Sequence, residues 1–153
     1  IVVLDPIIKA STADELLTQQ SVDTLKQVLL PKVKILTPNT FELEILAPNL
    51  DEQSAILSLP CEWVLLTTTD VSDSLIEHRL YYQGVLSERF SYHKLPGQYH
   101  GSGCTLSSAI SALIVADVDV SVAVKRALDY TYQTLLIAKR IGKMQYHPNR
   151  ITP

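Results

Sequence analysis

Short apolar runs alternate with stretches of helical periodicity along most of this chain. Continuous apolar runs closed by proline or by polar residues predict buried strands. These strands are expected at 1–4, 33–37 and 63–68. Between them apolar residues recur every three or four positions, as in amphipathic helices. These helices are expected at 13–30, 39–46 and 51–59.

The C-terminal half changes pattern. Runs at 76–82 and 85–92 flank Gln83-Gly84, which predicts a β-hairpin. Two longer helices follow, at 102–115 and from Asp119 to about residue 141. Strand–helix units followed by a hairpin and two helices predict an α/β sandwich built on a mainly parallel sheet.

Local signals fix several helix starts. Thr12 and Glu15 have the spacing of a capping box at the start of the first helix, which Pro31 is expected to stop. Asn39 and Glu42 have the same spacing at the start of the second helix.

Composition narrows the class of protein. The 153 residues predict one domain, and a hydrophobic content of 46% is ample for a core. A net charge of −3 without a basic run gives no support for a nucleic-acid partner or an anionic membrane surface. No apolar run approaches the roughly 20 residues that span a bilayer.

The cysteines and the first residue add two expectations. Cys61 and Cys104 match neither a disulfide framework nor a metal-ligand spacing, and reduced thiols fit a cytoplasmic protein. The chain opens at Ile1, within an apolar run that needs a neighbour on both sides if it forms a buried parallel strand. We therefore expect the C-terminal portion of a longer domain.

The most informative motif is His100-Gly101-Ser102-Gly103-Cys104-Thr105, which runs directly into an apolar helix. Glycines allow a ligand to approach the backbone, and the first amides and the dipole of a helix favour an anion such as phosphate. A cysteine in this position is a better base or nucleophile than a free thiol. The alternative is an ordinary turn followed by a small buried side chain.

Polar residues also follow the predicted strands, where ligands bind in open α/β sheets. Asp5 either faces such a site or only turns the chain before Pro6. Asn39 and Glu42 share a helical face toward the strand end, a placement compatible with their capping role. Thr67 and Thr68 either contact phosphate or simply favour a strand.

Three spaced segments carry a resemblance to a known family. They are Val3-Leu4-Asp5-Pro6, Leu36 to Glu44, and Leu95-Pro96-Gly97 with His100 to Ser107. Together they resemble the ribokinase-like superfamily, and within it the hydroxymethylpyrimidine/phosphomethylpyrimidine kinases of thiamine biosynthesis, in which cysteine replaces the usual aspartate base. The resemblance covers nearly the whole chain and corresponds to the C-terminal three-fifths of the family's length.

The resemblance implies a three-layer α/β/α sandwich with a hairpin edge and an ATP-dependent phosphotransferase that acts on a small pyrimidine. It implies these roles: Cys104 as base, with Gly101, Ser102 and Gly103 around the transferred group; Asp5 and Glu42 at magnesium (Mg²⁺); Asn39, Thr67 and Thr68 at ATP; and His100 in the substrate wall. His100 as a turn residue held by packing is an equal alternative. A homodimer is compatible with the resemblance, although the sequence itself does not determine oligomeric state.

Two departures keep other functions open. Thr67-Thr68-Thr69 stands where the family usually has Lys-Gly-Gly or Thr-Gly-Gly, and Gln145 to Asn149 replaces a glycine-rich ending. The alternatives are a pyridoxal or pyridoxine kinase, a non-catalytic nucleotide-binding module, and a cysteine hydrolase. The hydrolase needs a histidine base near Cys104.

Overall fold

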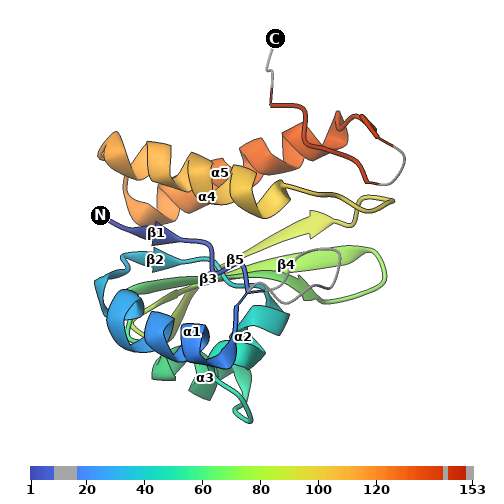
Figure 1. Ribbon diagram of the computed structural model, residues 1–153. Coiled ribbons are helices and arrows are strands. Elements are labelled where there is room, and N and C mark those ends of the chain that lie inside the picture. The colour runs from blue at the N-terminus through green and yellow to red at the C-terminus, as the bar shows by residue number, and fades with distance from the viewer. Residues whose placement is uncertain (9–16, 143–144, 151–153) are drawn as a thin grey trace. The chain divides into compact units, whose positions relative to one another are not determined.

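The computed structural model describes residues 1–8, 17–142 and 145–150 (Figure 1). The chain divides into two compact units, Ile1–Tyr92 and His93–Pro153. The first unit contains the β-sheet with the first three helices, and the second contains the two long helices. Each unit is described separately below.

The first unit is built on a five-stranded mixed sheet. Its strands are β1 (Val3–Leu4), β2 (Ile35–Leu36), β3 (Trp63–Asp70), β4 (Leu75–Tyr82) and β5 (Val85–His93), in the order β1-β2-β3-β4-β5. β1 and β3 each pair with β2 in parallel, and β4 pairs with β3 antiparallel. The expected α/β class and the hairpin edge are confirmed.

The hairpin turn follows from backbone geometry. Gln83 and Gly84 both have positive φ, at 47° and 80°. Two consecutive left-handed residues form the turn whose twist matches that of the flanking strands. The two-residue connection between β4 and β5 is therefore as the sequence predicts.

The first strand is less buried than the sequence predicts. β1 lies at one edge of the sheet, and β2 is its neighbour. Ile1 is 84% exposed and Val2 is 37% exposed, while Val3 and Leu4 are half-buried. The apolar run is thus an edge strand in the described residues, because one side of it has no strand there.

The helices of the first unit are α1 (Gln19–Thr24), α2 (Thr40–Leu46) and α3 (Glu52–Ser58). The predicted first helix is wrong at both ends. Thr18 caps α1 by accepting a hydrogen bond from the Ser21 N–H at 3.2 Å, so α1 begins after it. The expected capping box at Thr12–Glu15 lies outside the described residues.

Pro31 does not stop the helical segment. α1 continues as a π-helical stretch, Leu25–Leu29, and then as a 3-10 turn, Leu30–Lys32. Proline at the start of the 3-10 turn lacks only an N–H that has no partner at that position. The chain therefore stays helical to Lys32.

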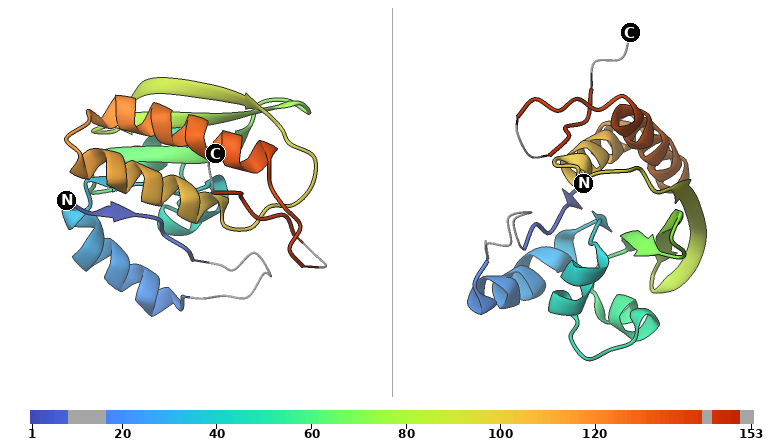
Figure 2. Two further views of the ribbon diagram at one scale, coloured as in Figure 1. Left: turned by 90° about the horizontal axis from the view of Figure 1, so that it is seen from above. Right: turned by 90° about the vertical axis from the view of Figure 1, so that its right-hand side faces the viewer.

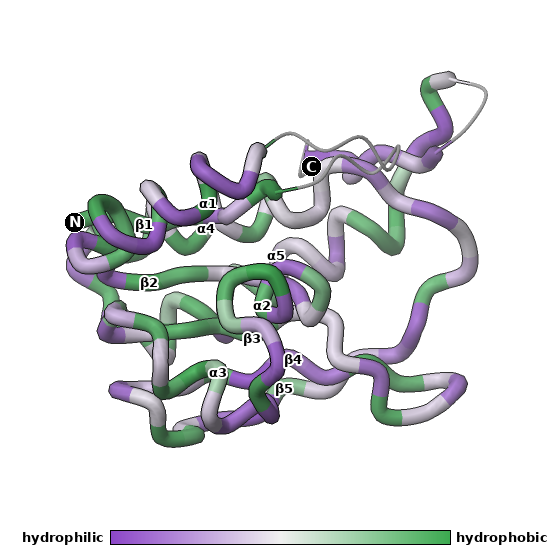
Figure 3. The backbone as a smooth tube through the Cα atoms, turned by 60° about the horizontal axis from the view of Figure 1, so that its bottom comes forward, coloured by the Kyte–Doolittle hydropathy of each residue, from purple (hydrophilic) through white to green (hydrophobic). Residues whose placement is uncertain are grey.

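Apolar side chains from the sheet and the three helices form the core of the first unit. Leu36, Val64 and Leu66 pack with Val22, Leu43 and Ile56, among others, and all are at least 95% buried. Figure 3 shows the hydrophobic colour running along β2 and the first part of β3. Ile35 and Leu65, which alternate with these strand residues, are fully buried as well, and so is Leu80, the β4 partner of Leu65.

The second unit is a helical hairpin with a returning tail. α4 (Ser102–Val115) and α5 (Val120–Leu136) lie side by side in both views of Figure 2. α5 ends earlier than predicted because Lys139 leaves the helix and exchanges two backbone hydrogen bonds with His147, at 3.0 and 2.9 Å. Across residues 1–8, 17–142 and 145–150, no helix is long and apolar enough to cross a membrane.

Candidate active site

The glycine-rich turn and the helix after it form as predicted. Gly101 is the N-cap of α4 and has a φ of +87°, a left-handed conformation that glycine adopts without strain. Its carbonyl oxygen accepts hydrogen bonds from the Thr105 N–H at 3.1 Å and the Thr105 hydroxyl at 2.7 Å. The amides of Ser102, Gly103 and Cys104 precede this first helical bond, so they have no partner within the helix.

Cys104 lies in the first turn of α4 and is exposed. It borders an open pocket of about 470 Å³ that Thr105, Tyr130 and Arg150 also line. The other cysteine, Cys61, is half-buried, and burial raises its pKa to about 11. Of the two thiols, Cys104 is therefore the one that a ligand can reach.

His100 is held beside the turn by the C-terminal tail. Its backbone N–H donates to the Tyr146 carbonyl at 2.9 Å, and its ring lies edge-on to that of His147, with centroids 5.7 Å apart. These contacts fit a turn residue held by packing. A role in a substrate wall stays a prediction.

In the first unit, Asp5 and Glu42 lie close enough for their charges to interact. Burial raises the pKa of Asp5 above its ordinary value. Burial also raises the pKa of Glu42, and the charge of Asp5 adds to this, while backbone hydrogen bonds from Asn39 and Ile8 act in the opposite direction. Two partly buried carboxylates that repel each other are a favourable donor set for a hard cation.

Asn39 and Glu42 form a complete capping box at the start of α2. The Asn39 N–H donates to Glu42 Oε2 at 2.9 Å, and the Glu42 N–H donates to Asn39 Oδ1 at 2.8 Å. The box turns the Glu42 side chain back toward the ends of β1 and β2. The capping role predicted from sequence is confirmed, and a role for Glu42 at a metal stays a prediction.

The threonine segment of β3 adopts an irregular conformation. The register with β4 shifts between Leu66 and Thr69, and Thr68 has a φ of +57°, which is strained for a β-branched residue. Thr67 pairs with Asn39, and both its N–H and its hydroxyl donate to the Pro38 carbonyl, at 2.8 and 3.2 Å. The strand therefore continues to Asp70, two residues beyond its predicted end at Thr68.

His78 supports this irregular segment, and sequence reasoning missed it. Its Nδ1 accepts a hydrogen bond from the Thr68 N–H at 3.3 Å, and its ring lies edge-on to Tyr92. Burial lowers the pKa of His78 to about 4, so the neutral ring is the stable form. Its position two residues before Leu80 on one strand face was the available signal of burial.

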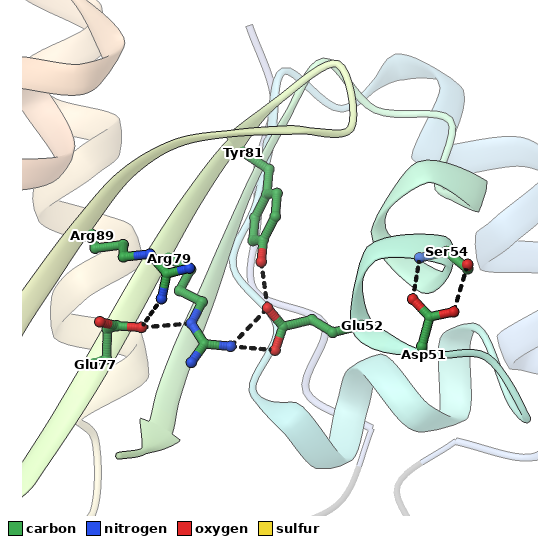
Figure 4. Close-up of polar contacts among 7 residues, drawn as sticks. All are labelled: Asp51, Glu52, Ser54, Glu77, Arg79, Tyr81 and Arg89. Carbon is green, nitrogen blue, oxygen red and sulfur yellow. Dashed lines mark hydrogen bonds and ion pairs between the residues drawn. The ribbon is translucent and has the colours of Figure 1, made fainter.

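A group of ion pairs on the hairpin was also missed (Figure 4). Arg79 Nη1 lies 2.6 Å from Glu52 Oε2, and Arg79 Nε lies 2.6 Å from Glu77 Oε1. Arg89 also contacts Glu77, and the Tyr81 hydroxyl donates to Glu52. Figure 4 shows these side chains pointing toward one another between the hairpin and α3, an arrangement that fastens the two elements together.

The predicted site residues thus form two groups, one in each unit. Asp5, Asn39 and Glu42 gather just after the ends of β1 and β2, and Asn39 pairs with Thr67 within β3. The residues from His100 to Cys104 gather at the start of α4. Across the described ranges, no cluster of three or more histidine, cysteine or acidic residues suits a metal ion, so the carboxylate pair is the candidate.

Comparison with known proteins shows which family the chain is similar to. A family model described as phosphomethylpyrimidine kinase matches residues 1–149. The hydroxymethylpyrimidine/phosphomethylpyrimidine kinase of Salmonella typhimurium is 35% identical over 122 residues, which are 73% of this chain and 46% of that protein. The enzyme of the same name from Aquifex aeolicus is 30% identical over 151 residues, which are 93% of this chain and 59% of that protein.

The chain therefore spans about half the length of the curated relatives it matches. Among solved structures, the pyridoxal kinase from Staphylococcus aureus in complex with AMP-PCP superimposes with a TM-score of 0.82 at 18% identity. The match covers 95% of this chain and 56% of that one. It confirms the expected ribokinase-like fold.

Proposed function

Because the chain belongs to the phosphomethylpyrimidine kinase family, we propose that it carries out the ATP-dependent phosphorylation of hydroxymethylpyrimidine and of its monophosphate. The observation that carries the proposal is the glycine-rich turn at the start of α4, with an exposed thiol beside three helix amides. Phosphoryl transfer depends mainly on positioning and on stabilising charge, and this turn offers both.

The turn is suited to the transferred phosphoryl group. The amides of Ser102, Gly103 and Cys104 begin α4 and have no helical acceptor. The positive end of the helix dipole lies at the same place, and the first turn carries no acidic side chain that would compete with a phosphate. Preorganised amides of this kind stabilise negative charge as it develops in the transition state.

Cys104 is proposed as the general base. A base must lie within hydrogen-bond distance of the hydroxyl that it deprotonates, so the substrate arm would have to enter beside the exposed thiol. The oxygen of the substrate's hydroxymethyl group bonds to the γ-phosphorus of ATP, and ADP leaves. The proton of that hydroxyl passes to the Cys104 sulfur. Cys104 forms no covalent bond to the substrate in this scheme.

Asp5 and Glu42 are proposed to hold a magnesium ion with its bound waters. Mg²⁺ keeps several waters and needs only one or two carboxylates, which matches this pair. The raised pKa values of Asp5 and Glu42 show that their negative charges are unfavourable as they stand, so a cation would be stabilised there. The ion would neutralise charge on the ATP phosphates.

Nucleotide contacts are proposed for Asn39, Thr67 and Thr68. The Asn39 side-chain oxygen already accepts the Glu42 N–H, which leaves the amide nitrogen for a phosphate oxygen. The Thr67 hydroxyl donates to Pro38, so it would face a ligand only through its lone pairs or after rotation. Thr68 lies next to Thr67 at the irregular part of β3, where the register with β4 shifts.

The test is a substrate panel with coupled ADP detection on the full chain, with ATP and magnesium. We expect turnover with hydroxymethylpyrimidine and its monophosphate, and much less with pyridoxine or pyridoxal. Cys61→Ala serves as a matched control, because that thiol lies in the other unit and should not affect turnover. Turnover of the pyridoxine series alone, or nucleotide binding without any transfer, would refute the assignment.

A further inference from the structure

The C-terminal segment of the second unit returns to the glycine-rich turn. The Tyr146 N–H donates to the Gln98 carbonyl at 2.8 Å, and the Tyr146 carbonyl accepts the His100 N–H at 2.9 Å. Farther along, the Asn149 N–H donates to the Thr134 carbonyl of α5 at 3.0 Å. The segment is thus fastened before the turn and on α5, and Arg150 follows directly.

Arg150 contacts both ends of the first turn of α4. Its Nε donates to Thr105 Oγ1 at 2.9 Å, and its Nη2 donates to the Gly101 carbonyl at 3.3 Å. The Thr105 hydroxyl in turn donates to the same carbonyl at 2.7 Å. The three groups close a ring of hydrogen bonds around the Gly101 peptide.

The approach of Arg150 depends on the glycine. A Cβ atom at Gly101 would lie 3.1 Å from Arg150 Nη2, which is tighter than most Cβ contacts. Gly101 therefore supplies both the left-handed conformation and the room for the guanidinium.

We propose that Arg150 is a positioning residue for phosphoryl transfer, which fixes and polarises the Gly101–Ser102 peptide at the start of α4. The inference rests on the proposed function, since it assigns Arg150 a role at the same turn. No residue of the segment 145–150 was among the site residues expected from the sequence.

Arg150 strengthens the Ser102 amide as a hydrogen-bond donor. The Gly101 oxygen accepts from the Thr105 amide, the Thr105 hydroxyl and the charged Arg150 guanidinium. Donors on a carbonyl polarise its peptide, and a charged donor does so most strongly. The N–H of the same peptide belongs to Ser102, so it becomes a better donor to an anion.

Arg150 also adds a positive charge at the start of α4. The guanidinium and the positive end of the helix dipole repel each other, whereas both of them attract an anion bound at the turn. Arg150 therefore makes the turn more favourable for a negatively charged group than the helix alone. The flat guanidinium reaches Thr105 and Gly101 with two different nitrogens, a geometry that lysine reproduces only in part.

The experiment compares Arg150→Met and Arg150→Lys with the wild-type full chain, using Arg126→Met as the matched control. Arg126 is exposed on α5 and contacts none of these groups. We expect kcat to fall about 10- to 100-fold in Arg150→Met, because a small misplacement of catalytic groups lowers the rate by such factors. The KM values for ATP and for the pyrimidine should stay within about threefold of those of the wild type. Arg150→Lys should recover part of kcat, and Arg126→Met should match the wild type.

Two further readouts separate this proposal from the function on which it rests. Hydrogen exchange at the Thr105 amide, which donates to the Gly101 carbonyl, and alkylation of Cys104 by iodoacetamide, located by mass spectrometry, need no turnover. We expect faster exchange in Arg150→Met than in Arg150→Lys or Arg126→Met, and an altered rate of Cys104 alkylation. Wild-type inactivity would refute the proposed function, while unchanged exchange and alkylation in Arg150→Met, or an unchanged kcat, would refute the role of Arg150.

Discussion

At the scale of single residues, Cys104 is the side chain on which the proposed chemistry depends most. It is exposed at the start of α4, beside amides that have no helical acceptor. The same amides favour a phosphate, so the base and the anion site share one turn of helix. The other thiol, at Cys61, is held protonated by burial and serves as an internal comparison.

Replacing Cys104 tests its role as a base. Cys104→Asp keeps a proton acceptor and should retain measurable transfer, whereas Cys104→Ala should lose about 10²–10⁴-fold in kcat if general-base catalysis is removed. Steady-state turnover measures both, and nucleotide affinity should change little. A Cys104→Ala protein with near-normal turnover would exclude the assignment.

His78 gives the first unit a dependence on pH. Its pKa in the folded protein is about 4, below the ordinary 6.5, so the unfolded chain binds more protons between these values. The free energy of unfolding should therefore fall as the pH falls from about 6.5 to about 4, by up to about 3 kcal/mol from this residue.

Denaturant unfolding of wild type and His78→Asn across this pH range isolates the effect. Asp5 and Glu42 have raised pKa values, so they change the free energy of unfolding with pH in the opposite direction. Both proteins contain these two residues, so their contributions cancel in the difference. His93→Asn, at an exposed position, is the control. A stability difference between wild type and His78→Asn that does not vary with pH would contradict the buried neutral ring.

At the scale of elements, α2 joins structure to the proposed metal site. Its capping box uses one oxygen of Glu42 for the Asn39 N–H, and the box directs the carboxylate toward Asp5. The capping role of Glu42 and its proposed role as a metal ligand are thus distinct. They can be separated by substitution.

Asn39→Ala should lower the free energy of unfolding by about 1 kcal/mol, because α2 loses its N-cap. Glu42→Gln keeps an oxygen for the Asn39 N–H but removes the charge, so its stability should stay closer to that of the wild type. The magnesium concentration for half-maximal turnover should rise in Glu42→Gln. Equal magnesium dependence in wild type and Glu42→Gln would remove Glu42 from the metal site.

The hairpin between β4 and β5 depends on its turn. Gly84 has a φ of +80°, and a Cβ atom there would lie 2.5 Å from Leu57 Cδ1. Gly84→Ala should therefore destabilise the protein by about 1–2 kcal/mol. Gly142 has an ordinary φ and no heavy atom within 4 Å of such a Cβ, so Gly142→Ala should be neutral or slightly stabilising. Thermal unfolding of the two variants gives the comparison, and equal shifts would contradict it.

Elements with local signals were predictable from the sequence. The capping box of α2, the glycine turn before α4 and the two-residue hairpin each depend on neighbouring residues alone. The bulge at Thr68 and the early end of α5 involve distant partners, His78 and His147. A single sequence holds no local record of such partners, so these features were missed.

The site shows the same division between local and distant signals. Residues that carry the family resemblance, such as Asp5, Glu42 and Cys104, were predicted as site residues from the sequence, and their roles stay predictions. His78 and Arg150 were missed, because each acts through a hydrogen bond to a segment far along the chain. Neither residue lies in a motif.

At the scale of the whole molecule, the proposed activity requires both units. The carboxylate pair belongs to the first unit and the turn with Cys104 to the second. The chain also spans about half the length of its curated relatives. The central proposal is that the γ-phosphoryl group of ATP is transferred to a pyrimidine hydroxymethyl arm with Cys104 as base.

The most direct measurement of that claim is the identity of the phosphorylated product. The wild-type protein and the Cys104→Ala variant would each be incubated with ATP, magnesium and hydroxymethylpyrimidine. The phosphorus-containing species would then be identified by phosphorus NMR and mass spectrometry. The account predicts a phosphate ester on the hydroxymethyl oxygen in the wild type, strongly reduced in Cys104→Ala. A phosphorylated Cys104, or ADP formed together with free phosphate and no ester, would contradict it.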